Sequence, residues 1–565
     1  IRHFEHNPQR SASTTTTTMS GQEEKKWIRG VNLGGWLLME RYIVPYQFAI
    51  TTCHLEGDLC WYPGALSAPD ESDPDYKICD FDKCKPVRFD SVFGWPDYPV
   101  DEWHLSSAFP FKTDAEKWLN YHFENFITRD DLVQMKEAGL THLRVPLPHW
   151  ILGSVALDEP WIPGDRWKYF LRLCQWAREI GLELWPSLHT APGSQNGFDN
   201  SGIQSTEYTC GGWEGLKSNV NRTLDVIDAI TAQMAHDNVL DVVTGWGILN
   251  EPFWDCDVNN YKQFMEDGLV IARANLGQET SIFVSDKFNA PTFNNGSWWL
   301  DESKYSNTYL DTHFYQVFDT NSRMDAPQKH IQDLCQPSKP EFDMTSCCYE
   351  DAPKNTIRSK GVQRISTEWS AAFDSMPGEL LQDVMRSIYE NNTAPDFDRV
   401  MSPARMQFLK QYVEAQIVQF EVADVGVSHG WFYWTIKLEG GAFAEWDFSR
   451  GVREGWIPTI AQPHQASQEL YGTCEQIQNR TTTDMSIVHA YPWGDEPYWT
   501  EGTWRDWVDY GRGSTSAIAP PKRHDLIISV VVAAVVLMIY FVVRCRGPSQ
   551  RKWNYTSVSD EVTEK

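Results

Sequence analysis

The chain has 565 residues, 41% of them hydrophobic, and a formal net charge of −28. This length suits one large domain with appendages, or two or three small domains. The acidic balance argues against a nucleic-acid partner, because phosphate binding needs clustered Lys and Arg and no such cluster occurs before residue 520.

Residues 1–26 are polar and contain the uninterrupted run Thr14–Thr18, which predicts a disordered or O-glycosylated arm. In residues 27–475, runs with strand character alternate with amphipathic helical patterns. The expected strands are Ile28–Leu33, Thr141–Pro146, Leu182–Leu188, Val242–Leu249, Ser281–Ser285, Tyr309–Phe314, Val362–Thr367 and Gly430–Trp434. The expected helices between them include Asp130–Ala138, Trp167–Ile180, Leu216–His236, Tyr261–Ala274, Gly378–Tyr389 and Ala404–Ala423.

Eight strands with intervening helices predict an α/β fold, a (β/α)8 TIM barrel. A doubly wound open sheet is the alternative. That fold usually carries a Gly-rich phosphate loop after its first strand, whereas here Gly34 and Gly35 are followed by the bulky Trp36. The barrel is therefore favoured.

Cysteines gather in two loop-like regions, an acidic insert at about residues 53–103 and a second stretch near residue 340. The cysteines concerned are Cys53, Cys60, Cys79 and Cys84, and then Cys335, Cys347 and Cys348. Such clusters suggest disulfides in an oxidising compartment, and the sequons at Asn221, Asn295, Asn391 and Asn479 agree with secretion. A zinc site is the competing interpretation, but no Cys-x-x-Cys pair or nearby His pair supports it, and the sequence leaves the disulfide pairing open.

The C-terminal part predicts a membrane anchor. Residues 476–524 are rich in Trp, Gly and Pro and suggest a stalk, and within residues 525–543 the segment Leu526–Val543 has no formal charge and is long enough to span a bilayer. Basic residues lie on both sides of this segment, with Arg544, Arg546, Arg551 and Lys552 beyond it. The expected arrangement is a single-pass protein of the cell membrane, with residues 544–565 cytoplasmic and the barrel outside. A tail-anchored cytosolic protein is the alternative.

Two apolar runs stop abruptly on glutamates. The first ends in Asn250-Glu251-Pro252, and the second runs through Thr367-Glu368-Trp369. In a parallel barrel the C-terminal strand ends form the active-site face, and a facing pair of carboxyl groups is the minimum equipment for glycoside hydrolysis. A single Glu is more often a solvated surface charge, but that interpretation weakens when the Glu follows an apolar strand.

Several motifs, in this order along residues 27–475, resemble glycoside hydrolase family 5 and in particular its fungal-type exo-β-1,3-glucanase branch. They are Arg29-Gly30-Val31-Asn32-Leu33-Gly34-Gly35-Trp36, Leu143-Arg144-Val145-Pro146, the run from Leu188-His189-Thr190 through Pro192-Gly193-Ser194-Gln195-Asn196-Gly197-Phe198-Asp199-Asn200-Ser201-Gly202, Asn250-Glu251-Pro252 and Thr367-Glu368-Trp369-Ser370. The Pro-Gly-Ser-Gln-Asn-Gly-Phe-Asp-Asn-Ser-Gly run is the most specific of them, whereas Asn-Glu-Pro is shared by many barrel hydrolases.

The resemblance implies that Glu251 is the acid/base and Glu368 the nucleophile, with Arg144 orienting the nucleophile. It places His189, Asn250, His313 and Tyr315 in the same pocket, Trp434 under the terminal glucose, Glu40, Asp199 and Asn200 on that glucose, and Phe198 and Phe318 as a clamp around the next sugar. Each has a plainer alternative: Arg144 as a buried ion pair, the histidines as core residues, and the aromatic rings as packing.

The sequence therefore predicts a retaining exo-β-1,3-glucanase that releases glucose from non-reducing ends of wall β-glucan, with transfer to another glucan as a side reaction. Neither a metal nor a cofactor is expected, and the chain is expected to be a monomer. The chain departs from the family pattern at Thr190, where a small residue is usual, in the insert and in the anchor. The alternatives are an endo-β-glucanase or glycolipid β-glucosidase of the same family, and a catalytically silent glucan-binding wall protein.

Overall fold

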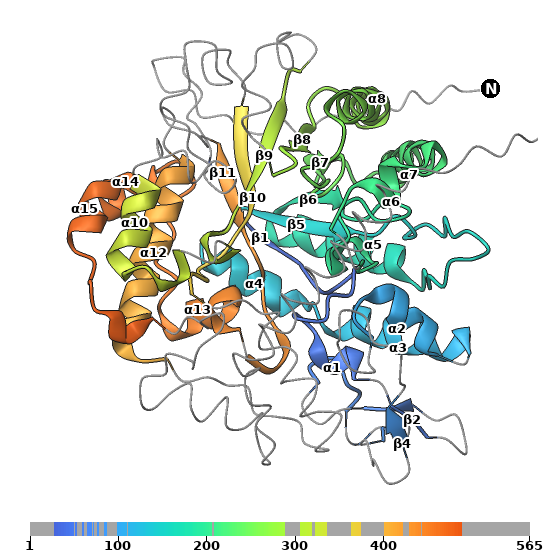
Figure 1. Cartoon of the computed structure of the whole chain (residues 1–565), viewed down its shortest axis with the longest axis horizontal. Helices are drawn as coiled ribbons and strands as arrows, with labels where there is room; N and C mark the ends of the chain where they lie inside the picture. The colour runs from blue at the N-terminus through green and yellow to red at the C-terminus, as the bar shows by residue number, and fades with distance from the viewer. Residues whose placement is uncertain are drawn as a thin grey trace, which may run out of the picture. The chain divides into compact units, whose positions relative to one another are not determined.

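The computed structural model describes residues 27–49, 51–53, 59–61, 65–70, 72, 76–77, 84–86, 99–109, 111–205, 208–288, 305–318, 322–335, 363–374, 401–421, 429–441 and 443–488. Eight parallel strands in these ranges close into a barrel in the order β1-β11-β10-β9-β8-β7-β6-β5 (Figure 1). They are β1 (Ile28–Asn32), β5 (His142–Leu147), β6 (Glu183–Leu188), β7 (Gly245–Gly247), β8 (Ser281–Ser285), β9 (Thr308–Phe314), β10 (Gln363–Trp369) and β11 (Gly430–Tyr433). The predicted barrel is confirmed.

Helices surround the barrel in Figure 1. Those within the described residues are α1 (Pro45–Phe48), α2 (Glu102–Ala108), α3 (Lys112–Asn125), α4 (Arg129–Glu137), α5 (Arg166–Ile180), α6 (Gly211–Glu214), α7 (Lys217–His236), α8 (Val258–Leu276), α10 (Pro327–Cys335), α12 (Pro403–Glu421), α13 (Phe448–Glu454), α14 (Ser467–Tyr471) and α15 (Cys474–Asn479). Local chemistry fixes some ends: a capping box of Thr128 and Asp131 starts α4, and left-handed Gly181 ends α5.

The strand β7 is shorter than the predicted Val242–Leu249. Only Gly245–Gly247 pair as a strand, and Val243 forms an isolated bridge to Leu184. Glycine is needed here, because a Cβ on Gly245 would lie 2.4 Å from the Trp185 ring and one on Gly247 would lie 2.5 Å from the Phe283 ring. Backbone hydrogen bonds to the neighbouring strands continue on both sides of these residues, from Leu184 N to Val242 O and from Asn250 N to Leu188 O.

The inside of the barrel has an apolar layer and a polar layer. Five side chains from five strands form the apolar cluster: Trp185, Phe283, Tyr309, Ile365 and Phe432. Residues two positions further along a strand point to the same side of the sheet. Polar side chains therefore follow the apolar layer toward the strand ends, among them Asn32, Arg144, Asp311 and Thr367.

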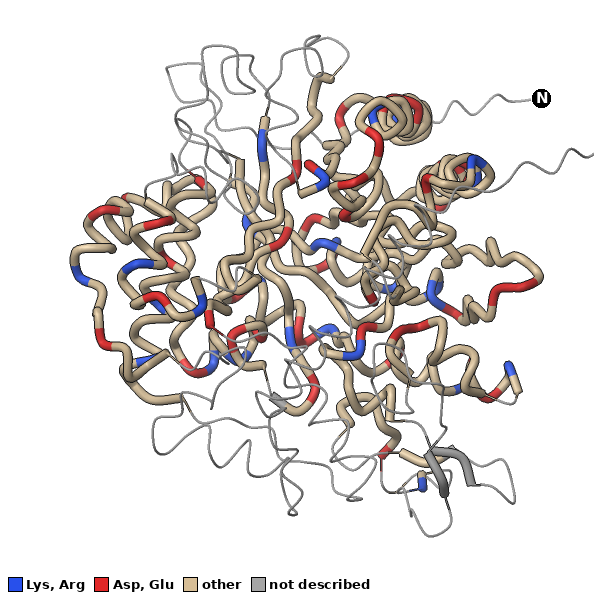
Figure 2. The backbone as a smooth tube through the Cα atoms, viewed as in Figure 1, with Lys and Arg blue, Asp and Glu red and all other residues tan. Residues whose placement is uncertain are grey.

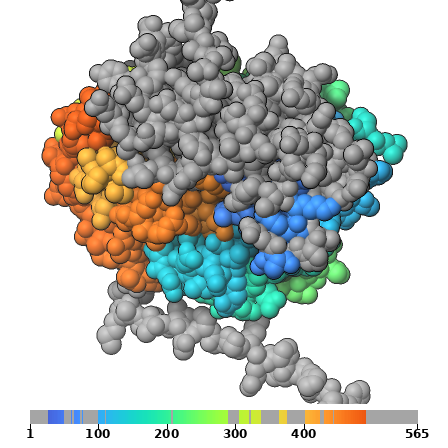
Figure 3. Space-filling view, turned by 90° about the horizontal axis from the view of Figure 1, so that it is seen from below, coloured from blue at the N-terminus to red at the C-terminus, as the bar shows by residue number. Residues whose placement is uncertain are grey.

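Closure of the barrel brings the two ends of the domain together. Strand β1 pairs with β11 on one side and with β5 on the other. On the face seen in Figure 3, C-terminal segments in orange accordingly lie beside N-terminal segments in blue and cyan. Figure 2 shows acidic and basic residues interspersed along the described part of the chain.

Two regions differ from the predicted organisation. The insert after β1 is not only loop, because β2 (Thr51–Cys53), β3 (Leu59–Cys60) and β4 (Cys84–Pro86) form a small antiparallel sheet within it. The expected stalk from residue 476 begins inside α15, and the short helix Met485–Ile487 follows. Ile477 and Ile487 are buried in the main hydrophobic core, so burial of apolar side chains carries the globular part to Val488.

Two disulfides lie within the described residues, Cys210–Cys256 and Cys335–Cys474. The second joins α10 to α15, so Cys335 pairs far along the chain and outside its own cysteine cluster. Of the sequons, Asn221 and Asn479 are exposed, and glycosylation stays a prediction.

Three predicted features lie outside the described residues: the helix Gly378–Tyr389, residues 1–26, and the anchor Leu526–Val543 with its flanking tail. Among the helices that the structure describes, none combines the length and apolar character needed to cross a bilayer.

Candidate active site

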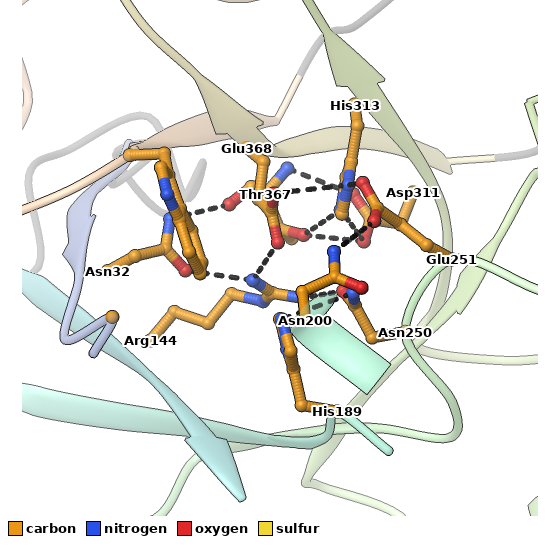
Figure 4. A network of polar contacts seen from close by, with 12 residues as sticks. Asn32, Arg144, His189, Asn200, Asn250, Glu251, Asp311, His313, Thr367 and Glu368 are labelled. Atoms are coloured by element: carbon orange, nitrogen blue, oxygen red, sulfur yellow. Dashed lines mark hydrogen bonds and ion pairs between the residues drawn. The ribbon is translucent and has the colours of Figure 1, made fainter. Parts of the chain in front are cut away.

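The two glutamates lie together at the C-terminal ends of the barrel strands. Glu251 follows β7, and Glu368 lies near the end of β10. Both are buried, 6% and 4% exposed, and one carboxylate oxygen from each lies within 4.8 Å of the other and of a ring nitrogen of His313. Figure 4 shows this network, in which Arg144 approaches from the opposite side to His313.

Glu368 is held by donors to both of its carboxylate oxygens. Arg144 Nη1 donates to Oε1 at 2.7 Å, and the Tyr315 hydroxyl donates to Oε2 at 3.0 Å. Burial raises the pKa of Glu368, and the charge of Glu251 raises it further, whereas His313 and Arg144 pull it down. Arg144 is thus the permanent counter-charge of this carboxylate.

Arg144 is itself fixed by two amide oxygens. Its Nη1 donates to Asn32 Oδ1 at 2.8 Å, and its Nη2 donates to Asn250 Oδ1 at 2.6 Å. Asn32 is anchored in turn, since its Nδ2 donates to the backbone oxygens of Thr367 and Tyr433. A guanidinium group has a rigid planar set of donors, so fixing both terminal nitrogens fixes its position against Glu368.

Glu251 has a different environment. Asn200 Nδ2 donates to its Oε2 at 2.7 Å, and His313 Nδ1 lies 2.6 Å from its Oε1. The backbone of Glu251 has a φ of +45°, in the left-handed region that residues with a Cβ rarely adopt. Asn196 Nδ2 donates to its carbonyl oxygen at 3.1 Å and helps to hold this conformation. Such backbone strain is typical of functional sites.

His313 joins the two carboxylates. Besides Glu251, its Nδ1 lies 3.4 Å from Glu368 Oε2, and its Nε2 lies 3.2 Å from Thr367 Oγ1 and 3.3 Å from Asp311 Oδ2. Burial lowers the pKa of His313, but the charges of Glu368, Asp311 and Glu251 outweigh it and raise that pKa well above its ordinary value. His313 is therefore a second cation in the network.

His189 is neutral and has one tautomer available. Burial and the nearby Arg144 charge lower its pKa well below the ordinary value. Because Asn250 Oδ1 accepts from Arg144, Asn250 Nδ2 is the atom that faces His189 Nε2, at 3.2 Å. Nε2 must then accept, and the ring proton is on Nδ1. That buried Nδ1 has no partner among the described residues.

A polar pocket with an aromatic wall adjoins the glutamates. Trp434 stacks on His189 with ring centroids 5.7 Å apart, and its Nε1 donates to the Tyr42 hydroxyl.

Two carboxyl groups belong to the same pocket, those of Glu40 and Asp199. Oε1 of Glu40 accepts from the Gly35 N–H, whereas the buried Oε2 has no hydrogen-bond partner among the described residues. Burial, followed by the charges of Asp199 and Glu368, raises the pKa of Glu40 well above its ordinary value. Burial raises the pKa of Asp199 to about 6, against the pull of Arg41.

The two aromatic residues predicted as a clamp lie in separate clusters. Phe198 contacts the rings of Tyr208, Phe253 and Phe288. Phe318 contacts Tyr315 and Trp446, and 51% of it is exposed. No ring contact joins Phe198 to Phe318.

Arg144, Asn200, Asn250, His313 and Tyr315 belong to the hydrogen-bond network around the glutamates. His189 joins it through Asn250, Trp434 stacks on His189, and Glu40 and Asp199 interact with each other by charge. Sequence reasoning did not single out Asn32, Tyr42, Asp311 and Thr367, which hold Arg144, Trp434 and His313. Asn32 is the last residue of β1, and Thr367 directly precedes Glu368 in β10, so the expectation that polar residues at the C-terminal strand ends form the site could have identified both.

Two groups of side chains have the composition of a metal site. One is Glu251, His313 and Glu368, but their oxygen and nitrogen atoms already pair with one another, with Arg144 and with Tyr315. The other combines Glu214 with Cys210 and Cys256, whose sulfurs form a disulfide and offer no thiolate. Neither group fits a metal ligand set as it stands.

The sequence is similar to curated glucan 1,3-β-glucosidases. It is 32% identical to that of Blumeria graminis over 444 residues, covering 76% of this chain and 86% of the relative. The Lachancea kluyveri enzyme is 27% identical over 447 residues, with the same coverage of both chains. No family model matches the sequence. Among solved structures, a rutinosidase from Aspergillus niger superposes with a TM-score of 0.49 at 16% identity, covering 77% of this chain and 98% of the other.

Proposed function

Because this chain belongs to glycoside hydrolase family 5, among the glucan 1,3-β-glucosidases, we propose that it hydrolyses β-1,3-glucan from the non-reducing end with retention of configuration. The proposal assigns the role of acid/base to Glu251 and that of nucleophile to Glu368. It also includes transfer of glucose to a second glucan when acceptor is abundant.

One observation carries the retaining mechanism. The nearest oxygens of the two carboxylates lie within 4.8 Å of each other. Retaining enzymes place their carboxyl groups about 5–5.5 Å apart, whereas inverting enzymes leave about 6.5–9.5 Å so that a water fits between nucleophile and sugar. The short separation supports direct attack by Glu368 on the anomeric carbon.

The charges of the network support the assignment of roles. Three carboxylates, those of Glu251, Glu368 and Asp311, face the two cations Arg144 and His313. A buried cluster of this kind approaches neutrality by holding one further proton. Glu251 is the carboxyl whose partners are an amide and a titratable ring, and this lack of a permanent counter-charge suits the role of general acid.

In the first step, Glu368 forms a bond to the anomeric carbon while the glycosidic oxygen departs with the proton of Glu251. Arg144 and Tyr315 keep the attacking carboxylate oriented, and the glucosyl ester on Glu368 is the product. In the second step, Glu251 removes a proton from water, the water oxygen attacks the anomeric carbon, and Glu368 is released. A sugar hydroxyl in place of water gives transfer.

Recognition of a terminal glucose is supported by unpaired polar atoms beside the glutamates. Glu40 Oε2 and His189 Nδ1 are buried without a hydrogen-bond partner among the described residues. Buried polar groups normally have partners, and sugar hydroxyl groups would supply them. Trp434 offers its ring face beside them.

The test is product analysis on laminarin whose reducing ends have been reduced, followed by NMR from the first turnovers. β-Glucose as the first product supports both exo action and retention. α-Glucose would overturn the roles given to the glutamates, and longer oligosaccharides as first products would overturn exo action. Carboxymethyl cellulose, which an endo-β-glucanase cleaves, serves as the comparison substrate.

A further inference from the structure

A cluster of aromatic rings extends outward from Phe198, beyond the pocket described above. Phe253 lies 5.6 Å from Phe198 between ring centroids, Phe288 lies 6.2 Å away and Tyr208 lies 4.9 Å away. Trp254 continues the row, with its ring 5.7 Å from that of Phe253. The rings therefore form a connected surface.

Exposure increases with distance from the glutamates along this row. Phe198, Phe253 and Phe288 are partly buried, whereas Tyr208 is 50% exposed and Trp254 is 53% exposed. A half-exposed tryptophan leaves a large apolar area in water, and connected exposed apolar surface of this kind typically marks a binding site.

The two exposed rings are held on a firmly tied pair of loops. The disulfide Cys210–Cys256 joins the segment after Tyr208 to the segment after Trp254. Asp255 accepts hydrogen bonds from the Thr209 hydroxyl at 2.6 Å and from the Cys210 N–H at 2.8 Å. The disulfide and the two hydrogen bonds hold the two loops, and the rings that they carry, in a fixed relative position.

A buried lysine also holds the loop that carries Trp254. Lys287 is 1% exposed, and its Nζ donates at 2.7 Å to the carbonyl oxygens of both Trp254 and Cys256. Its backbone has a φ of +51°, a conformation that the tightly packed surroundings must maintain. These ties fix the position of the Trp254 backbone before any ligand arrives, which lowers the entropy cost of binding.

The position of the cluster identifies its occupant. Phe253 follows Glu251 by two residues, and Phe198 precedes the Asn200 that donates to Glu251. The acid/base stands on the side where the glycosidic oxygen leaves. The rings therefore border the path of the departing chain, or of an entering acceptor, and not the pocket of the terminal glucose.

We propose that Tyr208 and Trp254 form a stacking platform for the glucan chain on the leaving-group side, outside the first sugar held at Phe198. This inference rests on the function proposed above. Aromatic faces suit the C–H faces of β-linked glucose units, and the platform gives the enzyme a preference for longer chains and for glucan acceptors.

The test compares chain-length preference in wild type and variants. The quantity measured is the ratio of kcat/KM on laminaripentaose to kcat/KM on p-nitrophenyl β-glucoside, whose leaving group is too short to reach Trp254. In Trp254→Ala and in Tyr208→Ala this ratio should fall about three- to tenfold. Trp254→Phe, which keeps a ring, should restore most of it. The yield of transfer products from laminaripentaose should fall in parallel.

Phe111→Ala is the matched control, because Phe111 is 62% exposed at the start of α3 and belongs to none of the segments that flank Glu251. Its ratio should equal that of wild type. An active Trp254→Ala enzyme with the wild-type ratio would overturn the platform alone. Wild-type protein inactive on both substrates would overturn the proposed function, and the platform with it.

Discussion

The surroundings of Glu368 and Glu251 differ although both residues are buried glutamates at strand ends of one barrel. Glu368 faces a permanent cation, Arg144, and a fixed hydroxyl donor from Tyr315. Glu251 faces an amide from Asn200 and the titratable ring of His313. The first set of partners favours the ionised form of Glu368, whereas the partners of Glu251 are one amide and one ring.

The comparison teaches that the role of a carboxyl group follows from its partners and not from its burial. Both side chains are nearly inaccessible, and their nearest oxygens share His313 Nδ1 as a neighbour. Changing the two glutamates and two of their partners one at a time therefore tests it, and four variants do so in order of decreasing effect.

Glu368→Gln replaces the proposed nucleophile while keeping the size of the side chain. We expect kcat on laminarin to fall by about 10⁴- to 10⁶-fold, the range seen when an enzyme loses its nucleophile. Thermal unfolding of the variant should show that it is folded. Activity within tenfold of wild type would refute the role of Glu368.

Glu421→Gln is the matched control for that variant. Glu421 is also 4% exposed and also pairs with an arginine, Arg29, at 2.8 Å, but Arg29 lies near the start of β1, away from the strand ends that carry the glutamates. Weakening a buried pair there should lower the free energy of unfolding by up to about 3–5 kcal/mol. Turnover per folded molecule should remain that of wild type.

Glu251→Gln replaces the proposed proton donor. On laminarin, whose leaving group needs a proton, kcat/KM should fall by about 10³-fold. On 2,4-dinitrophenyl β-glucoside, whose leaving group departs without one, the first step should be nearly unaffected. Initial rates on laminarin and burst kinetics on 2,4-dinitrophenyl β-glucoside measure the two losses. Equal losses on both substrates would contradict the acid role.

His313→Gln removes the ring shared by both glutamates, and we expect a loss of about 10²-fold in kcat/KM. Its pH dependence has a defined sign. Because the surrounding carboxylates raise the pKa of His313 in the folded protein, the protonated ring stabilises the fold below its unfolded pKa of about 6.5. That contribution is lost as pH rises through the folded pKa.

The difference in free energy of unfolding between wild type and His313→Gln should accordingly be largest below about pH 6.5 and shrink at alkaline pH. Urea unfolding curves over a pH series measure it. A difference that stays constant with pH would mean that His313 is not a cation in the folded protein.

Tyr315→Phe removes one donor from Glu368 and should have the smallest effect, about tenfold in kcat/KM. Loss of a donor to the ionised form raises the pKa of Glu368, so the acid limb of the pH–rate profile should move to higher pH. Tyr261→Phe removes another buried hydroxyl, which donates to the Ser285 carbonyl oxygen at 2.8 Å, and should leave the profile unchanged. An unshifted acid limb in Tyr315→Phe would count against this contact.

Much of the barrel was accessible from the sequence because the strands are buried on both faces and read as apolar runs. Ser281–Ser285 is predicted to the residue, and β5, β6 and β9 to within one residue at each end. The short helices α2 and α10, of seven and nine residues, were not predicted, because a helix of this length is stabilised mainly by tertiary packing, which for α10 is contact with α12 and α15.

Glu251 and Glu368 were accessible because each closes a run with strand character, whereas the position of Arg144 in the site was implied by the resemblance of Leu143-Arg144-Val145-Pro146 to the family. The sequence does not show which of these side chains contact one another in the folded protein. That Asn200 reaches Glu251, or that Phe198 and Phe318 lie in different clusters, depends on loop geometry fixed by tertiary contacts such as those of Asn196 and Gln195. The same holds for the Cys335–Cys474 pair, 139 residues apart in the chain.

The left-handed backbone at Glu251 has a consequence for selection. A glycine would adopt a φ of +45° without strain, and it would also remove a buried carboxyl group, so Glu251→Gly should fold at least as readily as wild type. A mutant library sorted for yield alone would tolerate losses of function at this position. Only a screen that demands glucose release would keep the glutamate in place.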